Sequence, residues 1–290
     1  MSIELGLLGA HLRAHEVSPE KAVEVERAGY GTVWLDASPP ADLALAERLL
    51  EATSGLVVGT SVVNVWTAEA GAVAASYHRI VARYPDRFLL GVGIGHREVH
   101  AEYASPYATL ASYVDELTAA GVPSGRVVLA ALGPRMLRLA RDRTAGSVPC
   151  MVTPEHTRQA REILGVDKLL LPGHFAVMEP DATRARELAR SAPAATGLQV
   201  TNYASNLRRL GFTDHDLAGS GSDRLIDALV LYGAPATVAA GIVAHLDAGA
   251  DHVGIYPLGD DPIDTLRRVA EAVGAVRAPR RAPRSASGQA

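Results

Sequence analysis

The stretch from residue 56 to residue 96 constrains the fold more than any other part of the chain. Leu56–Val63 is an apolar, β-branched run, typical of a strand buried on both faces. Glu69–Arg83 carries apolar residues at three- and four-residue spacing, which predicts an amphipathic helix that Pro85 ends. Phe88–Val92 is a second buried strand. Two such strands joined by a helix must pair in parallel, so their carboxyl ends reach the same edge of the sheet.

That edge is where we expect the functional site, because ligands of parallel α/β sheets bind at the carboxyl ends of the strands. The residues that leave the two strands there are Asn64, Trp66, Gly93, Ile94, Gly95 and His96. Glycines at this position would let the backbone approach a flat ring closely. They would equally suit a tight turn between a strand and a helix.

The unit of a helix, a glycine and a strand recurs along the chain. Gly29, Gly121 and Gly249 each follow a predicted helix and precede an apolar strand, as left-handed helix caps do. We count eight strands, near Ile3, Thr32, Leu56, Phe88, Arg126, Ser147, His174 and His252. Eight strands alternating with helices predict an α/β fold in which the parallel sheet closes as a (β/α)8 TIM barrel.

One segment interrupts this rhythm, and we expect the rest of residues 1–276 to form a single barrel domain. Residues 198–232 are interpreted as an insertion of short helices before the last strand, which shapes substrate access. Asn202, Tyr203 and Arg208 lie in this insertion and are candidate substrate contacts. Residues 277–290 are Pro, Arg and Ser without periodicity, which predicts a disordered tail.

Composition excludes several classes of function. The net charge of -4 leaves no basic footprint for nucleic acid, and no apolar run reaches the roughly 18 residues that a membrane span needs. Cys150 is the single cysteine, so no disulfide framework is expected. The first residues do not read as a signal peptide. We therefore expect a cytoplasmic protein with a small-molecule substrate and no nucleic-acid or membrane partner.

Four segments, in their order along the chain, resemble the luciferase-like flavin and deazaflavin oxidoreductases, in particular the branch that uses the deazaflavin coenzyme F420. They are Gly59–Asn64, Arg83–Gly93, Ala131–Met136 and Leu246–Val253. The resemblance implies a barrel, usually a homodimer, with the cofactor ring set into the carboxyl end. In such proteins a non-proline cis peptide ends the third strand and backs the ring, and the matching bond here joins Ser61 and Val62.

The resemblance also implies roles for single residues. His96 matches a position where related sugar-phosphate dehydrogenases carry an acid/base glutamate, and a histidine there could transfer a proton near neutral pH. Asp36 ends the second strand, where related proteins often place Asp and His, and Asn64 suits the polar edge of a deazaflavin. His11 faces the same mouth by position, and Trp66 is interpreted either as a pocket wall or as core packing.

Two predicted helix starts suit an anion. Arg135 lies in the first turn of a helix that opens at Gly133-Pro134, where a cation opposes the helix dipole unless an anion binds between them. Thr153-Pro154 is a second helix start, with free N–H groups that an anion could accept. In the resembled family the phosphate tail of the cofactor lies over this side.

The leading hypothesis is an F420-dependent oxidoreductase that moves a hydride between the deazaflavin and a small organic substrate. One alternative is an FMN-dependent monooxygenase on the same fold. Another is a non-catalytic barrel that binds flavin or deazaflavin without turnover. A metal site is not predicted, because His96 and His100 follow a glycine turn and no third ligand is evident.

Overall fold

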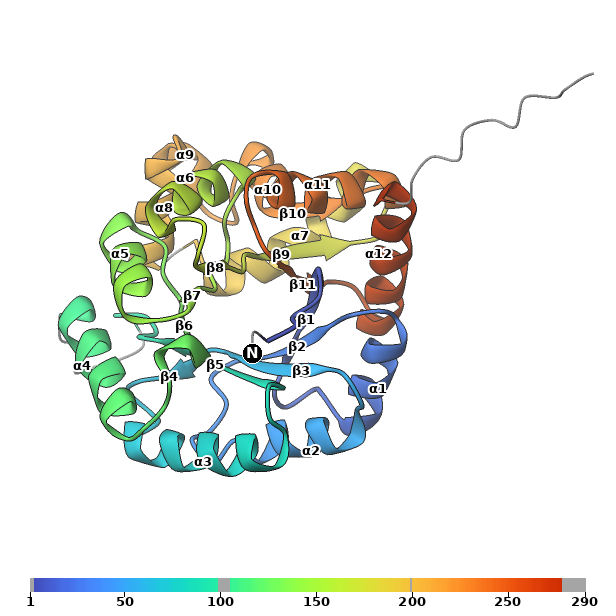
Figure 1. The fold of residues 1–290 in the computed structure, drawn as a ribbon. Helices are drawn as coiled ribbons and strands as arrows, with labels where there is room; N and C mark the ends of the chain where they lie inside the picture. Colours follow the sequence, from blue (N-terminus) through green and yellow to red (C-terminus); the bar gives the residue numbers. More distant parts are fainter. Residues whose placement is uncertain (1–2, 99–104, 199, 278–290) are drawn as a thin grey trace, which may run out of the picture.

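The computed structural model describes residues 3–98, 105–198 and 200–277, in which strands and helices alternate (Figure 1). The strands are β1 Leu8–Arg13, β2 Thr32–Asp36, β3 Val57–Ser61, β4 Val63–Asn64, β5 Phe88–Gly93, β6 Val127–Leu129, β7 Gly146–Ser147, β8 Leu169–Leu170, β9 Gly173–Val177, β10 Val230–Tyr232 and β11 Val253–Pro257. The helices are α1 Pro19–Arg27, α2 Ala44–Ala52, α3 Ala70–Arg83, α4 Pro106–Ala119, α5 Pro134–Arg143, α6 Pro154–Leu164, α7 Ala182–Thr196, α8 Thr201–Arg209, α9 Asp214–Leu217, α10 Asp223–Leu229, α11 Pro235–Asp247 and α12 Pro262–Arg277.

The sheet closes into a barrel. Its order is β10-β9-β11-β1-β2-β3-β5-β6-β7-β8, with β4 beside β5 and every pair parallel. Two residues separate β8 from β9, and Cys150, just beyond β7, forms a parallel bridge to Gly173 at the start of β9. The ring therefore runs from β9 through β11, β1, β2, β3, β5 and β6 to β7. The bridge between Cys150 and Gly173 returns it to β9. With β3 joined to β4 and β8 joined to β9, it has the eight strands of the predicted (β/α)8 barrel.

The first strand begins later than the sequence analysis predicts. The apolar run was expected to be a strand from Ile3 to Leu8, but β1 is Leu8–Arg13. Gly6 adopts a left-handed φ of 69°, and the Leu5 carbonyl accepts a hydrogen bond from Thr32 Oγ1 at 2.7 Å. Ile3 and Leu5 instead pack into the interior of the barrel at its amino-terminal end. As a result, His11 and Arg13 lie within the strand rather than after it.

Bulky side chains fill the lower part of the barrel. Trp34 is fully buried, and its indole N–H donates to Nε2 of His252 at 3.0 Å. Gly59 makes room for this ring, because a Cβ at position 59 would lie 2.4 Å from it. Leu5, Val57, Leu89, Val128, Val148 and Leu171 pack in the same cluster. The barrel is thus closed at the amino-terminal end, and free space remains at the carboxyl end.

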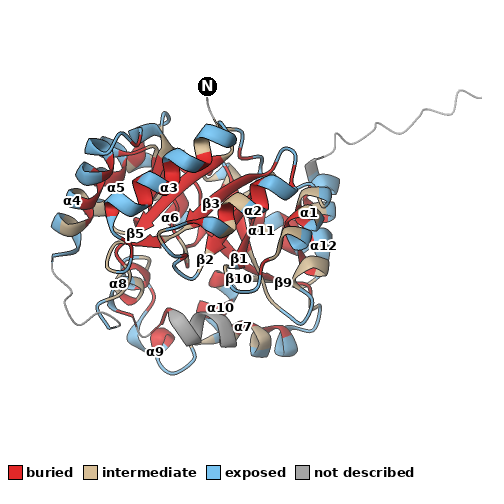
Figure 2. Ribbon diagram, turned by 90° about the horizontal axis from the view of Figure 1, so that it is seen from below, coloured by how far each residue is buried: buried red, intermediate tan, exposed pale blue. Residues whose placement is uncertain are grey.

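The helices cover the barrel with their apolar faces. Figure 2 shows buried strands inside and exposed outer helix faces. The predicted cap of α1 is confirmed, since the Ser18 side chain accepts a hydrogen bond from the Lys21 N–H. The left-handed caps at Gly29, Gly121 and Gly249 are also present. None of the helices in the described ranges combines the length and apolar character that a bilayer crossing requires.

The interruption before the last strand follows α7 and contains α8, α9 and α10, as short helices were predicted there. Its last residues differ from the prediction, because Val230–Tyr232 form β10, which pairs with the carboxyl end of β9 outside the ring. The predicted tail, residues 277–290, lies outside the described residues except for Arg277, the end of α12.

Candidate active site

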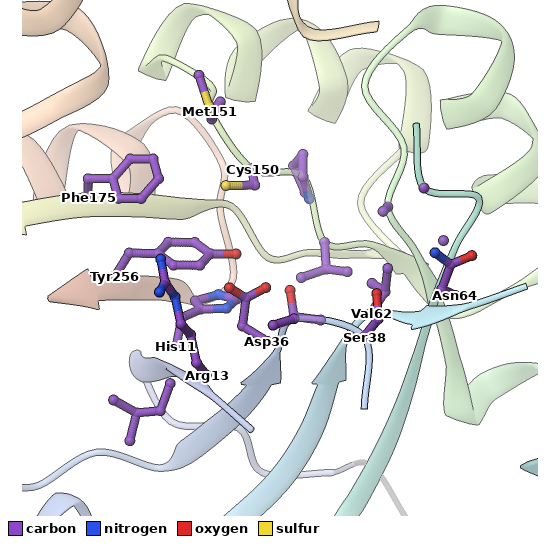
Figure 3. Close-up of a pocket in the computed structure, with 18 of the residues that line it drawn as sticks. His11, Arg13, Asp36, Ser38, Val62, Asn64, Cys150, Met151, Phe175 and Tyr256 are labelled. Atoms are coloured by element: carbon purple, nitrogen blue, oxygen red, sulfur yellow. The ribbon is translucent and has the colours of Figure 1, made fainter. Parts of the chain in front are cut away.

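A cavity of about 750 Å³ opens at the carboxyl ends of the strands (Figure 3). Its walls come from the ends of β1, β2, β3, β5, β9 and β11, from the loops after β6 and β7, and from α8. Sequence-predicted residues that line it are His11, Asp36, Ser61, Val62, Asn64, Gly93, Ile94, Gly95, His96, Asn202 and Tyr203. The predicted residues outside its lining are Trp66, Arg135, Thr153 and Arg208. The roles assigned to all of these residues stay predictions.

One wall is a narrow backbone surface. The peptide bond between Ser61 and Val62 is cis, as the family resemblance implied. The Val62 side chain packs over Gly93, where an added Cβ would lie 2.3 Å from Val62 Cγ2. Trp66 fixes this wall from outside the cavity, because its indole N–H donates to the Ile94 carbonyl at 2.7 Å. Its backbone N–H also donates to Asn64 Oδ1 at 3.0 Å.

Aromatic rings form the floor. The His11 ring stacks on Tyr256, with centroids 3.9 Å apart and planes 12° apart, and Phe175 lies 5.0 Å from the same tyrosine. Burial, together with the charge of a protonated His252, holds the pKa of His11 well below its ordinary value. Neither ring nitrogen of this buried, neutral histidine has a hydrogen-bond partner within the described residues. His11 thus lies under Tyr256, at the bottom of the cavity.

A carboxyl group, two phenols and a thiol gather at this floor. Burial raises the pKa of Asp36, although the backbone N–H of Ala37 and the charge of Arg13 act in the opposite direction. Burial raises the pKa of the Cys150 thiol to about 12. The pKa values of Tyr203 and Tyr256 lie well above the ordinary value, chiefly through burial and also through the neighbouring Cys150 and Asp36. The thiol and the two phenols are therefore protonated at neutral pH, and Asp36 binds its proton more tightly than an exposed aspartate does.

Sequence reasoning did not single out Cys150, Met151, Phe175 and Tyr256, although they line the cavity. Tyr256 lies near the carboxyl end of β11, and Asp36 was selected by the rule that functional residues lie at the carboxyl ends of strands. That rule would have found the tyrosine. Cys150 and Met151 follow a strand of only two residues, whose carboxyl end no sequence pattern marks.

Two turns at the rim contain non-glycine residues with left-handed backbone. Ala37 and Ser38, directly after β2, have φ values of 64° and 54°, and Met151, after β7, has a φ of 55°. Such conformations are costly for side chains with a Cβ and gather where a binding site demands a particular turn. All three residues line the cavity, which supports a functional role for this edge.

His96 ties the loop after β5 to α8. Its Nδ1 lies 3.1 Å from Asn202 Oδ1, and its ring centroid lies 5.4 Å from that of Tyr203. Glu98 adds a second connection, because its Oε1 accepts hydrogen bonds from the Thr201 N–H at 2.9 Å and from its hydroxyl at 2.6 Å. His96 is partly buried at the rim, and α8 is held as one side of the cavity mouth.

Next to the cavity, two arginines surround the amino-terminal end of α5. Leu132 lines the cavity, and the following Gly133 is the N-cap of α5, with no side-chain cap. A Cβ at Gly133 would lie 3.2 Å from Nη2 of Arg209. Arg135 lies over the Tyr107 ring at 4.2 Å. Within the described residues, neither arginine forms an ion pair with an acidic side chain, unlike most arginines of the chain.

A buried amide faces the same region. Asn206 is 2% exposed, and its Oδ1 accepts a hydrogen bond from Arg209 at 3.0 Å. Its Nδ2 has no partner among the described residues, which leaves a buried donor available. Asn202, Asn206 and Arg209 lie on one face of α8 because they are spaced four and three residues apart. This face carries polar groups from the cavity toward the α5 N-terminus.

The remaining predicted residues have local partners. Thr153 caps α6, since its hydroxyl accepts a hydrogen bond from the His156 N–H at 3.3 Å. Arg208 pairs with Asp214 at 2.8 Å on a separate surface hollow. No group of three His, Cys, Asp or Glu side chains in the described ranges is arranged to hold a metal ion, and His100 lies outside those ranges.

No protein-family model matches the chain, and no curated protein matches it. Solved structures share its fold. An F420-dependent secondary alcohol dehydrogenase in complex with an F420-acetone adduct has a TM-score of 0.72 and 15% identity, over 94% of this chain and 99% of that chain. A coenzyme F420 dependent tetrahydromethanopterin reductase from Methanopyrus kandleri has a TM-score of 0.69 and 15% identity, over 93% and 99%.

A flavin protein shares the fold over a similar length of this chain. The oxygenating constituent of 3,6-diketocamphane monooxygenase from Pseudomonas putida, in complex with FMN, has a TM-score of 0.62 and 14% identity, over 93% of this chain and 99% of that chain. F420-dependent enzymes and an FMN-binding monooxygenase thus share the fold of this chain over almost its whole length, and the resemblance seen in the sequence extends to the structure.

Proposed function

We propose that the protein is an oxidoreductase that binds coenzyme F420 at the mouth of its barrel and transfers a hydride between this deazaflavin and a small organic substrate. The observation that carries the proposal is that two features lie next to each other. A cavity at the carboxyl ends of the strands includes Leu132 in its lining, and directly after Leu132 comes an uncapped helix N-terminus with two arginines that lack acidic partners in the described chain. The first feature suits a flat ring, and the second suits the phosphate of its tail.

The residues present fit such a cofactor. Val62, Asn64 and the Gly93–Gly95 turn offer a flat wall with hydrogen-bonding groups for the ring. Arg209, Arg135 and the first N–H groups of α5 would hold the phosphate, and the unpartnered Asn206 Nδ2 supplies a further donor beside them. When bound, a deazaflavin supplies reversible two-electron hydride chemistry. The chain's own contribution is to position the ring, exclude water and move a proton.

The choice of F420 over FMN rests on chemistry, because F420-dependent and FMN-binding proteins both share the fold. A deazaflavin lacks the ring nitrogen that lets flavins form stable oxygen adducts, so hydride transfer is favoured over oxygenation. The cavity floor here carries a carboxyl group and phenols suited to proton movement beside such a transfer. The F420-dependent secondary alcohol dehydrogenase shares the fold over 94% of this chain.

The test is a titration of the purified protein with oxidised F420 and, separately, with FMN, followed by cofactor fluorescence. We expect micromolar binding of F420 and much weaker binding of FMN. Preference for FMN would move the protein to the monooxygenase alternative. Binding of neither would overturn the assignment, and binding without reduction by any donor would indicate a non-catalytic barrel.

The phosphate contact has its own test. Arg209→Gln removes a charge that contacts phosphate without deleting the side chain, and we expect it to weaken F420 binding by about tenfold to a hundredfold, the range for one charge-assisted contact. Arg158→Gln is the matched control, because Arg158 pairs with Glu155 and Glu162 on the exposed face of α6. Equal affinities for the two variants would remove Arg209 from the site.

A further inference from the structure

We propose that Asp36 is the acid–base residue of this site and that the substrate is an uncharged, apolar alcohol or ketone seated against Tyr256, Phe175 and Met151. The inference deepens the proposed function and rests on it. It differs from the expectation drawn from the sequence, which gave proton transfer to His96 and only a cofactor contact to Asp36.

The position of Asp36 carries the first step. In Figure 3 its carboxyl group and the Tyr256 hydroxyl point into the same part of the cavity. No ion pair within the described residues involves this carboxylate, and Arg13, whose charge acts on it, pairs with Glu16 at 3.6 Å. A carboxyl group without a cation, at the floor of an open cavity, is available to a bound hydroxyl or carbonyl oxygen.

The groups around Asp36 set its proton affinity. From β1, Arg13 stabilises the carboxylate and Glu16 destabilises it. From the other side of the barrel, Cys150, Tyr203 and Tyr256 approach, and these groups remain protonated at neutral pH because burial raises the pKa of each. Burial is the largest influence on Asp36 and raises its pKa above the ordinary value of an aspartate.

His96 is less suited to this role. Its ring lies at the rim of the cavity, where Nδ1 is 3.1 Å from Asn202 Oδ1 and is not available to a substrate. That bond supports α8 as a side of the mouth, whereas Asp36 lies on the floor below. The two carboxyl-side neighbours of Asp36, Ala37 and Ser38, cannot replace it, because neither side chain exchanges a proton near neutral pH.

The walls define the substrate class. Met151, Phe175, Tyr203, Tyr256 and Leu258 give this side of the cavity an aromatic and aliphatic surface. The lining charges are paired with each other, since Glu16 contacts both Arg13 at 3.6 Å and His15 at 3.3 Å. An anionic substrate would therefore lose its hydration without gaining a partner, and it would be repelled by the Asp36 carboxylate. An uncharged molecule with one hydroxyl or carbonyl group packs against the apolar surface and forms a hydrogen bond with Asp36.

The proton balance is complete. When an alcohol is oxidised, its carbon gives up a hydride to the bound deazaflavin, the C–O bond becomes a double bond, and the hydroxyl proton passes to the Asp36 carboxylate. Asp36 then releases that proton to solvent. In the reverse direction, protonated Asp36 donates to the oxygen of the ketone as the hydride arrives.

The first test does not depend on the cofactor. Infrared difference spectra of the cofactor-free protein, recorded from about pH 4 to about pH 8, should contain the band of a protonated carboxyl group that titrates above the ordinary range of aspartate. Asp36→Asn should remove that band. Asp167→Asn, on an exposed loop before β8, should leave it. Survival of the band in Asp36→Asn would overturn the proposal.

The second test uses acetophenone and 1-phenylethanol as uncharged probes and 4-acetylbenzoate as the anionic probe. Acetophenone should bind the protein with an affinity that falls as Asp36 loses its proton, and 4-acetylbenzoate should bind at least tenfold more weakly. In Asp36→Asn the acetophenone affinity should become independent of pH, because an amide always donates. Equal binding of neutral and anionic probes would contradict the assigned substrate class.

Turnover measurements distinguish whether Asp36 or His96 carries the proton. With bound F420 and a neutral alcohol substrate, Asp36→Asn should lower kcat by about a hundredfold or more and remove the acidic limb of the pH profile, while Asp36→Glu restores part of both. If that limb persists in Asp36→Asn and disappears in His96→Gln, the proton carrier is His96 and the proposal is wrong. Failure to bind F420 would instead count against the proposed function, and the infrared titration would still decide the protonation of Asp36.

Discussion

At the scale of single residues, the two tryptophans show how similar hydrogen bonds serve different ends. Both indole N–H groups donate, Trp34 to His252 in the closed end of the barrel and Trp66 to the Ile94 carbonyl beside the cavity. Position in the sequence could suggest that Trp66 is near the site. Sequence position could not show that the Trp66 side chain lies behind the cavity wall, because this placement depends on how the turn of residues 93–95 packs against the indole ring.

We expect Trp66→Phe and Trp34→Phe to have separable effects. Trp66→Phe removes one hydrogen bond to a half-buried carbonyl, so it should cost about 1 kcal/mol of unfolding free energy but clearly weaken cofactor binding. Trp34→Phe leaves a void and a buried His252 nitrogen without its donor, so it should cost about 3 kcal/mol. Urea denaturation and cofactor titration measure the two effects. A larger stability loss in Trp66→Phe than in Trp34→Phe would contradict this view of the barrel.

At the scale of elements, much of the barrel is readable from the sequence, because each strand is a short apolar run between a helix cap and a turn. The ends of β2, β3 and β5 were found in this way, and they bring Asp36, Ser61 and Gly93 to one cavity. The contacts across the mouth were not predictable. Tyr203 meets Tyr256 only because α8 folds back over the barrel, and its packing there is long-range information that no local pattern carries.

The connection between Glu98 and Thr201 is what we expect to hold α8 in that place. Glu98→Ala removes both hydrogen bonds to Thr201, so the amide protons of α8 should exchange at least several-fold faster, with little change in global stability. The substrate KM should rise, since one side of the mouth is loosened. Hydrogen exchange followed by mass spectrometry measures this. Glu155→Ala, which breaks an exposed pair on α6, is the control, and equal exchange of α8 in both variants would refute the assignment.

At the scale of the whole molecule, the barrel buries several histidines in neutral form. Burial lowers the pKa of His245 and of His252 to about 4, and it lowers those of His11, His156 and His174 as well. Their nitrogens have few partners, and His174 Nδ1 and His245 Nε2 have none within the described residues. Such groups fold only uncharged, so the stability of the entire barrel depends on pH, a property that composition alone does not reveal.

The sign of that dependence follows from the direction of the shifts. In the unfolded chain these histidines take up protons below about pH 6.5, whereas in the folded barrel His245 and His252 do so only near pH 4. The unfolded state therefore binds more protons in this window, and stability present above about pH 6.5 is lost as the pH falls toward 4, by about 3 kcal/mol for each of these two histidines. Urea denaturation at a series of pH values measures the loss. His245→Gln should reduce the slope by nearly one proton between about pH 6 and pH 4.5, while His78→Gln, at an exposed hydrogen bond, should not. An unchanged slope in His245→Gln would mean that His245 is already protonated in the folded barrel, which its burial against His174 makes unfavourable.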